Sequence, residues 1–318
     1  MKIRLKVLTP IHIGSGEEIS PVEYLVQDNK FIRINMQTLF EDKEFKSLMD
    51  KFIIAFQNQR YIGDLLPKEL LLKHSLYSLN ISSKERFNFI NVKSFIKSAN
   101  RVYIPGSSLK GAILSAVIWK KAKEKRIKNI DKSLIDIVIG EVSNRPLHNK
   151  FSRWLDVSDS SFKFPSDSLE ISLVKLVGSK TRRQLPILYE TLKEGTTFDF
   201  EIKTSVDSID KFGKLSEEEI LTAVDEFYKK VLQKEKEFKF SQKLPDCKTS
   251  FLIRIGQGST CLSTSFLILA EDLGINYKLF RPPIGKRKIP PLYPGEQPQT
   301  RKLVNGELSL GWAKIERL

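Results

Sequence analysis

A junction between a β-prone run and a long apolar helix limits the folds open to this chain more than any other segment does. Residues 101–119 read RVYIPGSSLKGAILSAVIW, so the extended run ends at Pro105 and Gly106. Beyond it, apolar residues recur at helical spacing, which is typical of a helix packed on a sheet. The residues of this stripe are Leu109, Ala112, Ile113, Ala116 and Val117. Glycines and serines in the first turn also leave backbone amides free to hold an anion.

The remaining segments predict a mixture of strands and helices. Apolar and basic residues alternate from Lys2 to Val7, and VEYLVQDNKFIRIN predicts a hairpin that turns at Asp28 and Asn29. Three later runs, LEISLVKLV, TFDFEIK and FLIRI, also predict strands, and a helix follows a capping-box spacing at SEEE. Because helices and hairpins separate the strands, we expect an α+β fold with an antiparallel, ferredoxin-like sheet.

The length of the chain favours one large or two ordinary domains. We expect two packed α+β halves, residues 1–165 and 166–318, with a helical insertion at about 41–100. The segment from 281 to 304 is rich in proline, glycine and basic residues. It predicts an irregular surface loop before a last strand near ELSLGWAKIERL.

Basic residues outnumber acidic ones by 53 to 38, which gives a formal charge of +15 and favours a nucleic-acid partner over a membrane. No stretch reaches the roughly 18 apolar residues of a spanning helix, and the first residues lack a secretory apolar region. We therefore expect a cytoplasmic protein. Cys247 and Cys261 form no C-x-x-C pair and the three histidines lie far apart, so we expect no metal site, disulfide framework or cofactor.

Three glycine-bearing loops flank the predicted elements: LTPIHIGSG, IPGSSLKGA and RIGQGSTCLSTS. Glycine lets a phosphate approach the backbone and serine adds donors, so such loops suit a sugar-phosphate chain, although one such loop alone is more often an ordinary turn. The runs GSKTRRQ and TRKLV place cations beside hydroxyl groups. On charge alone we assign Arg182, Arg183 and Arg301 to phosphates.

Nucleotide hydrolysis and serine-type catalysis lack their motifs. Lys110 precedes Gly111 instead of following it, which excludes a Walker loop, and no G-x-S-x-G elbow occurs. Metal-independent RNA cleavage stays open, because the imidazole of His12 could act as a general acid or base on a ribose 2′-hydroxyl. A histidine without a visible partner more often packs or hydrogen-bonds in a turn.

Taken together, the loops resemble the RAMP superfamily of CRISPR-associated proteins. The motifs LTPIHIGSG, YIPGSSLKGAILSA, RIGQGS, TRKLV and LGWAKIE occur in the matching order between Leu8 and Glu316. Their wide spacing, the insertion and the terminal LGWAKIE are most similar to the fifth-subunit family of the type III-A (Csm) effector complexes. The resemblance implies RRM-like domains and a scaffold that binds crRNA, caps the 3′ end of the guide and touches an adjacent backbone RAMP subunit. It also implies a part in crRNA maturation, through recruited host nucleases.

Carried over by position, the resemblance implies a set of residues that line the guide, with His12 of the first loop added as an RNA contact. These residues are Gly14, Ser15, Gly16, Gly106, Ser107, Ser108, Lys110, Gly111, Gly256, Gly258 and Ser259. The related subunit that cuts target RNA has an aspartate after its HIG motif, whereas EEISPVEYLV has none here. Although Glu17, Glu18 and Glu23 are not excluded as metal ligands, we expect a non-catalytic protein. An endoribonuclease that uses His12 is the alternative, and an unrelated RRM-like RNA-processing protein is a remoter one.

Overall fold

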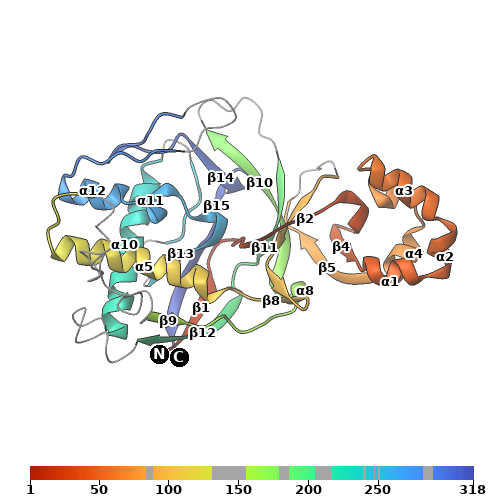
Figure 1. The fold of residues 1–318 in the computed structure, drawn as a ribbon, viewed down its shortest axis with the longest axis horizontal. Coiled ribbons are helices and arrows are strands. Elements are labelled where there is room, and N and C mark those ends of the chain that lie inside the picture. Colours follow the sequence, from red (N-terminus) through yellow and green to blue (C-terminus); the bar gives the residue numbers. More distant parts are fainter. Residues whose placement is uncertain are drawn as a thin grey trace, which may run out of the picture.

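The computed structural model describes residues 1–83, 89–130, 155–178, 186–204, 216–238, 241–246, 248–249, 251–281 and 289–318. A first sheet is covered by two long helices, a second sheet stands beside it, and a small helical lobe projects from the far end of the second sheet (Figure 1). No helix within these ranges combines the length and the apolar character needed to cross a membrane. The expected α+β class is confirmed.

The first sheet has the topology of a ferredoxin-like fold. Its strands are β1 (Lys2–Val7), β9 (Leu155–Val157), β12 (Thr197–Thr204), β13 (Leu252–Arg254) and β16 (Trp312–Arg317), in the spatial order β13-β16-β1-β12-β9. All of these neighbours are antiparallel. With α5 (Gly106–Glu124) and α10 (Glu217–Lys236), the chain order β1-α5-β9-β12-α10-β16 is the βαββαβ pattern, and β13 extends the edge.

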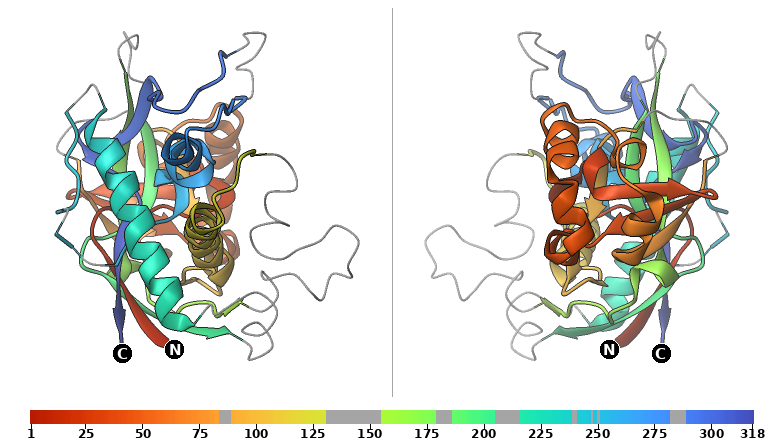
Figure 2. Two further views of the ribbon diagram at one scale, coloured as in Figure 1. Left: turned by 90° about the vertical axis from the view of Figure 1, so that its left-hand side faces the viewer. Right: turned by 90° about the vertical axis from the view of Figure 1, so that its right-hand side faces the viewer.

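The long helices lie side by side on one face of this sheet (Figure 2). In α5, the predicted stripe is inward, because Leu109, Ile113, Ala116 and Val117 are fully buried. Helix α10 begins at the predicted capping box, in which the Ser216 hydroxyl accepts from the Glu219 amide. The Tyr228 hydroxyl of α10 donates to the Ala112 carbonyl of α5 at 3.1 Å, which joins the two helices.

The second sheet is built from segments inserted between the elements of the first. Its path is β2-β6-β11-β10-β5-β4-β3, and β14 joins β10 and pairs with β15. The bounds are β2 (Gly14–Ile19), β3 (Tyr24–Gln27), β4 (Lys30–Ile34), β5 (Ser75–Ile81), β6 (Val92–Phe95), β10 (Leu169–Gly178), β11 (Ile187–Leu192), β14 (Thr300–Val304) and β15 (Leu308–Ser309). The predicted hairpin turns at Asp28 and Asn29, both with positive φ. Because both sheets combine strands from both sides of residue 165, the predicted division at 165 does not match the topology.

The insertion is helical only in its first part. Helices α1 (Met36–Glu41), α2 (Lys43–Ser47), α3 (Met49–Gln57) and α4 (Lys68–Lys73) form the small lobe in Figure 1. The expectation that residues 41–100 stay helical is wrong beyond α4, because β5 and β6 belong to the second sheet. In β5, Tyr77, Leu79 and Ile81 are buried in period-two alternation, which is the pattern of a half-buried strand. The short strands β7 (Lys97–Ser98) and β8 (Arg101–Val102) then lead to α5.

The basic tail is also more regular than expected. Its last residues, TRKLV, form strand β14 and pair with β10, so the predicted irregular loop ends before residue 300. In β14, Leu303 and Val304 are buried, and Leu303 lies opposite Lys175. The predicted last strand is present as β16, and its pairing with β1 brings both chain termini to the same end of the first sheet (Figure 1).

Candidate nucleic-acid interface

The structure brings the first and third glycine-bearing loops into direct contact. The Gln257 amide donates to the His12 carbonyl at 2.9 Å. Gly311, from the terminal LGW motif, donates to the Pro10 carbonyl at 2.9 Å and accepts from the Ile255 amide at 2.9 Å. Three motifs that are far apart in sequence therefore form one junction, called here the loop junction: residues 9–16, 255–259 and 310–312. Helix α11 (Cys261–Thr264), which follows this junction, packs against α5.

Two glycines that were predicted to face RNA, Gly256 and Gly258, instead pack against backbone inside the loop junction. Gly256 has φ +71°, and a Cβ at this position would lie 2.3 Å from the His12 carbonyl oxygen. A Cβ on Gly258 would lie 2.1 Å from the Leu310 carbonyl oxygen. The space beside both residues is filled by protein backbone, so the interpretation that they give a phosphate access is corrected. Gly16 and Gly111 are exposed, and a Cβ added to either would meet no atom within 4 Å.

Gly14, Ser15 and Gly16 lie at the start of β2, an edge strand of the second sheet. All three are exposed, and the pairing with β6 shifts register between Gly14 and Glu18. The Ser15 hydroxyl accepts from the Glu17 amide at 3.2 Å. Because the pairing here is irregular and the strand is at an edge, backbone donors on its outer side are accessible to a ligand.

The N-terminus of α5 is only partly open. The Gly106 amide donates to the Asp159 carboxylate at 2.7 Å, and a Cβ on Gly106 would lie 2.2 Å from the Val157 carbonyl. The expectation of free amides is therefore wrong at Gly106, because a carboxylate of the same chain already occupies this position. Ser107 and Gly111 remain exposed, with Ser108 and Lys110 partly exposed beside them. No carboxylate pairs with Lys110 in the part of the chain that the structure describes.

A pocket of about 290 Å³ opens at the loop junction. Its lining combines loop backbone with hydroxyl, amide and basic side chains: Leu176, Arg254, Gln257, Gly258, Ser259, Thr260, Cys261, Pro298, Thr300, Arg301 and Lys302. This composition provides hydrogen-bond donors of several kinds around one concave surface.

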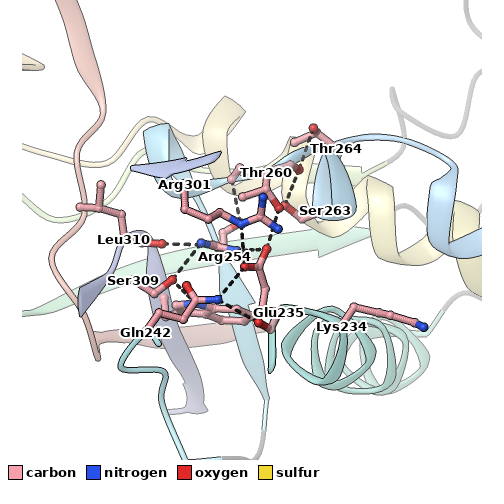
Figure 3. Close-up of polar contacts among 12 residues, drawn as sticks. Lys234, Glu235, Gln242, Arg254, Thr260, Ser263, Thr264, Arg301, Ser309 and Leu310 are labelled. Atoms are coloured by element: carbon pink, nitrogen blue, oxygen red, sulfur yellow. Dashed lines mark hydrogen bonds and ion pairs between the residues drawn. The ribbon is translucent and has the colours of Figure 1, made fainter. Parts of the chain in front are cut away.

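Arg254 and Arg301, which line the pocket, belong to a buried ion-pair network. Figure 3 shows this network. Glu235 of α10 is fully buried, and its carboxylate lies 2.9 Å from Arg254 Nη1 and 3.0 Å from Arg301 Nε. Arg254 also donates to Ser309 Oγ at 2.9 Å and to the Leu310 carbonyl at 3.1 Å. Arg301 is 3% exposed. The assignment of Arg301 to an RNA phosphate is corrected: its side chain is an internal partner of Glu235.

The network carries an excess of positive charge. Burial alone would raise the pKa of Glu235, but the guanidinium groups of Arg254 and Arg301 outweigh it and hold the pKa at about 2. Glu235 is therefore ionised at neutral pH, and one carboxylate faces two guanidinium groups. Both arginines belong to the lining of the pocket, so the surplus positive charge there favours an anion.

Lys302 is the basic residue of TRKLV that faces outward. Its ammonium group donates to the Tyr189 hydroxyl at 3.1 Å and to Gln257 Oε1 at 3.4 Å, beside the loop junction. The charge pattern of the sequence indicated its neighbour Arg301 instead. Side chains alternate between the two faces of a strand, so a strand at TRKLV places Arg301 and Leu303 on the inner face and Lys302 on the outer face. This alternation would have indicated Lys302 as the accessible cation.

His12 is a buried part of the loop junction. Only 2% of the residue is exposed, its Nδ1 lies 2.7 Å from the Glu190 carbonyl, and its ring packs 4.5 Å from that of Tyr189. Burial lowers the pKa of His12 to about 4, against the opposing effect of the Glu190 hydrogen bond. The expectation that His12 contacts RNA is corrected by this burial, because its imidazole packs inside the protein.

The burial of His12 predicts a loss of stability at mildly acidic pH. The folded imidazole has a pKa of about 4, below its ordinary 6.5, so the unfolded chain takes up the proton first as pH falls. The free energy of unfolding should therefore be greatest above pH 6.5 and fall by up to about 3 kcal/mol as the pH approaches 4. Urea unfolding across this range measures the effect. A His12→Gln variant should show a flatter pH dependence, and a slope equal to that of the wild type would contradict the assignment.

Most of the remaining predicted residues stay at the surface. These are Gly14, Ser15, Gly16, Ser107, Ser108, Lys110, Gly111 and Ser259. Arg182 and Arg183 lie outside the described residues. The exposed candidates thus lie at three places: the β2 edge, the pocket with Lys302, and the first turns of α5.

Comparisons with known proteins agree with this fold. The family model described as RAMPs, RAMP superfamily, matches residues 4–260. A Methanocaldococcus jannaschii protein named CRISPR system Cms protein Csm5 is 30% identical over an alignment of 235 residues, and the alignment covers 64% of this chain and 52% of that protein. The Streptococcus thermophilus protein of the same name is 29% identical over an alignment of 246 residues, and the alignment covers 68% of this chain and 66% of that protein. The matched part thus spans about half of the first relative and just under two thirds of the second.

Two solved structures share the fold over nearly the whole chain. One is a chain of the cryo-EM structure of a Csm-crRNA-target RNA ternary complex in a type III-A CRISPR-Cas system, with a TM-score of 0.78 and 24% identity over 99% of this chain and 100% of that one. The other is the crystal structure of T.onnurineus Csm5, with a TM-score of 0.71 and 22% identity over 98% and 99% of the two chains. The sequence motifs, the shared fold and the family model lead to one conclusion: this chain belongs to the RAMP superfamily.

Proposed function

We propose that this chain is a non-catalytic subunit of a type III-A CRISPR effector complex and binds the guide RNA of that complex, the crRNA. Two relatives are Csm5 proteins, at 30% and 29% identity. The observation that carries the proposal is the pocket at the loop junction, where hydroxyl groups and Lys302 lie above two guanidinium groups paired with one carboxylate. This arrangement suits the phosphates of a single strand.

The proposed RNA surface joins the β2 edge, the pocket and the first turns of α5. The binding residues are Gly14, Ser15, Gly16, Ser107, Ser108, Lys110, Gly111 and Ser259 from the sequence, with Lys302 from the structure. In this proposal the subunit caps the 3′ portion of the guide and contacts one adjacent backbone RAMP subunit. It assists crRNA maturation through recruited nucleases.

The burial of His12 supports the non-catalytic part of the proposal. A general acid or base must come within hydrogen-bond reach of the 2′-hydroxyl, and a residue that is 2% exposed lacks that access in this conformation. Labelled repeat RNA incubated with the full chain in EDTA should be recovered at full length. Specific cutting that a His12→Ala variant abolishes would instead establish the endoribonuclease alternative.

Salt dependence tests the RNA surface directly. The affinity of the full chain for single-stranded RNA should fall steeply with salt, with a logarithmic slope of about −0.7 for each phosphate contact. Lys302→Ala and Lys110→Ala should each weaken binding at low salt and reduce the slope by about 0.7, because each removes one phosphate contact. Fluorescence anisotropy over a salt series measures both quantities.

Lys51→Ala supplies the matched control, because Lys51 is exposed on α3 in the helical lobe. This variant should keep the wild-type affinity and slope. Binding that is insensitive to salt, or equal losses in all three lysine variants, would contradict the proposed surface.

A further inference from the structure

A small ribbon beside α5 exposes aromatic rings that the RNA surface described above does not include. Strand β8 and the segment around Lys163 pair antiparallel, with reciprocal backbone hydrogen bonds between Val102 and Lys163 of 2.8 and 2.9 Å. Val102 is fully buried. Because side chains alternate along a strand, the residues on either side of Val102 and of Lys163 share the outer face of the ribbon.

The outer face carries four side chains, Arg101, Tyr103, Phe162 and Phe164, called here the aromatic face. Phe162 is 53% exposed and Phe164 is 54% exposed, although an aromatic ring gains more free energy from burial than most side chains do. The Tyr103 and Phe162 rings lie 5.4 Å apart, and the Arg101 guanidinium lies 3.9 Å from the centre of the Phe164 ring. Two ring surfaces and one stacked cation thus face solvent together.

The chemistry of the aromatic face fits unpaired bases. Every base presents a π-face that stacks on an aromatic ring, and a stacked guanidinium keeps its N–H edge available for a phosphate. No carboxylate pairs with Arg101 among the residues that the structure describes. The ribbon continues from Tyr103 through Ile104 and Pro105 into the first turn of α5, where Ser107 and Lys110 belong to the proposed RNA surface.

We propose that the aromatic face stacks unpaired bases of a single-stranded RNA whose backbone follows the first turn of α5, with Arg101 on an adjoining phosphate. This inference rests on the proposed function and extends it, because it assigns base contacts to a surface otherwise built for phosphates. Stacking of this kind tolerates any base, so the site takes single-stranded RNA with little sequence preference.

The test replaces each exposed ring by an aliphatic side chain of similar apolar character. Phe162→Leu and Phe164→Leu should each weaken the binding of single-stranded RNA to the full chain by roughly tenfold. The salt slope should stay at the wild-type value, because no phosphate contact is removed. Phe56→Leu is the matched control: Phe56 is 63% exposed on α3 in the helical lobe, and its loss should leave RNA binding unchanged.

A second arm uses RNA of the same length whose sugars lack bases. The wild type should bind this strand more weakly than normal RNA, and the Phe164→Leu variant should bind it as well as the wild type does. Thermal unfolding of each variant checks the fold, which exposed leucines should leave intact.

The outcomes separate the two proposals. If the wild type shows no salt-dependent RNA binding, the proposed function itself fails. If the wild type binds as expected and both phenylalanine variants match it, only the aromatic face is wrong. Variants that keep RNA affinity but lose affinity for a neighbouring backbone subunit would also overturn the inference, since the rings would then be a protein contact.

Discussion

Replacing Glu235 by glutamine is expected to lower the free energy of unfolding by about 3–5 kcal/mol. The carboxylate is fully buried between Arg254 and Arg301, which are 2% and 3% exposed. A glutamine keeps the shape of the side chain but leaves both guanidinium groups without a counter-charge in a dry environment. Removing one partner of a buried ion pair lowers the free energy of unfolding by far more than the intact pair adds to it. The reason is that the charge left behind stays buried and cannot return to water.

Urea unfolding at neutral pH measures this loss, with Glu237→Gln as the control. Glu237 lies one residue after the same helix and its side chain is 49% exposed in an ion pair with Lys234, so its replacement should cost less than about 1 kcal/mol. The pKa of Glu235 is held at about 2, so its contribution is present above pH 4.5 and is lost as the pH falls towards 2. The wild type and the variant should therefore converge in acid. Equal stability at neutral pH would show that the network does not stabilise the fold.

Replacing Gly256 by alanine is expected to lower the free energy of unfolding by about 3 kcal/mol or more. The same variant is expected to bind RNA more weakly. The residue has φ +71°, which disfavours any side chain, and the added Cβ would lie 2.3 Å from the His12 carbonyl. Relief of this clash must separate the first and third loops. Denaturant unfolding and RNA anisotropy on the same preparation measure the two effects.

Gly111→Ala provides the matched control for the stability measurement. Gly111 lies in α5, its added Cβ would meet nothing within 4 Å, and its φ is not positive. Alanine there should stabilise the chain by up to about 1 kcal/mol, because it lowers the entropy of the unfolded state. A Gly256→Ala variant that is as stable as the wild type would contradict the close approach of the two loops.

The sequence predicted the elements whose pattern is local. Period-two alternation identified β1, short strand-prone runs identified β10 and β12, and the capping box identified the start of α10. The order of the small-residue motifs identified the family. In each case neighbouring residues contain the signal, because the spacing that makes a strand or a helix amphipathic is visible within a short window.

The errors at Gly106 and Gly256 concern contacts between distant segments. Asp159, which caps α5 at Gly106, lies 53 residues further along the chain, and no local pattern indicates it. The glycine at position 256 is explained by the His12 carbonyl, again a tertiary contact. The error at Arg301 is of another kind, because a strand at TRKLV places Arg301 on the buried face. We expected an irregular loop there, since the residues before it are rich in proline, and so the alternation of this strand was not applied.

The position of β16 has a consequence for the order in which the protein assembles during synthesis. β16 lies between β1 and β13, and Leu5 pairs with Ile315. β1 pairs with β12 on one side, but its other side must wait for β16, which the ribosome makes about three hundred residues after β1. Closure of such a long loop makes this second pairing slow. Because Gly311 in the same segment joins the first and third loops, a nascent chain that still lacks it should not yet be competent to hold RNA.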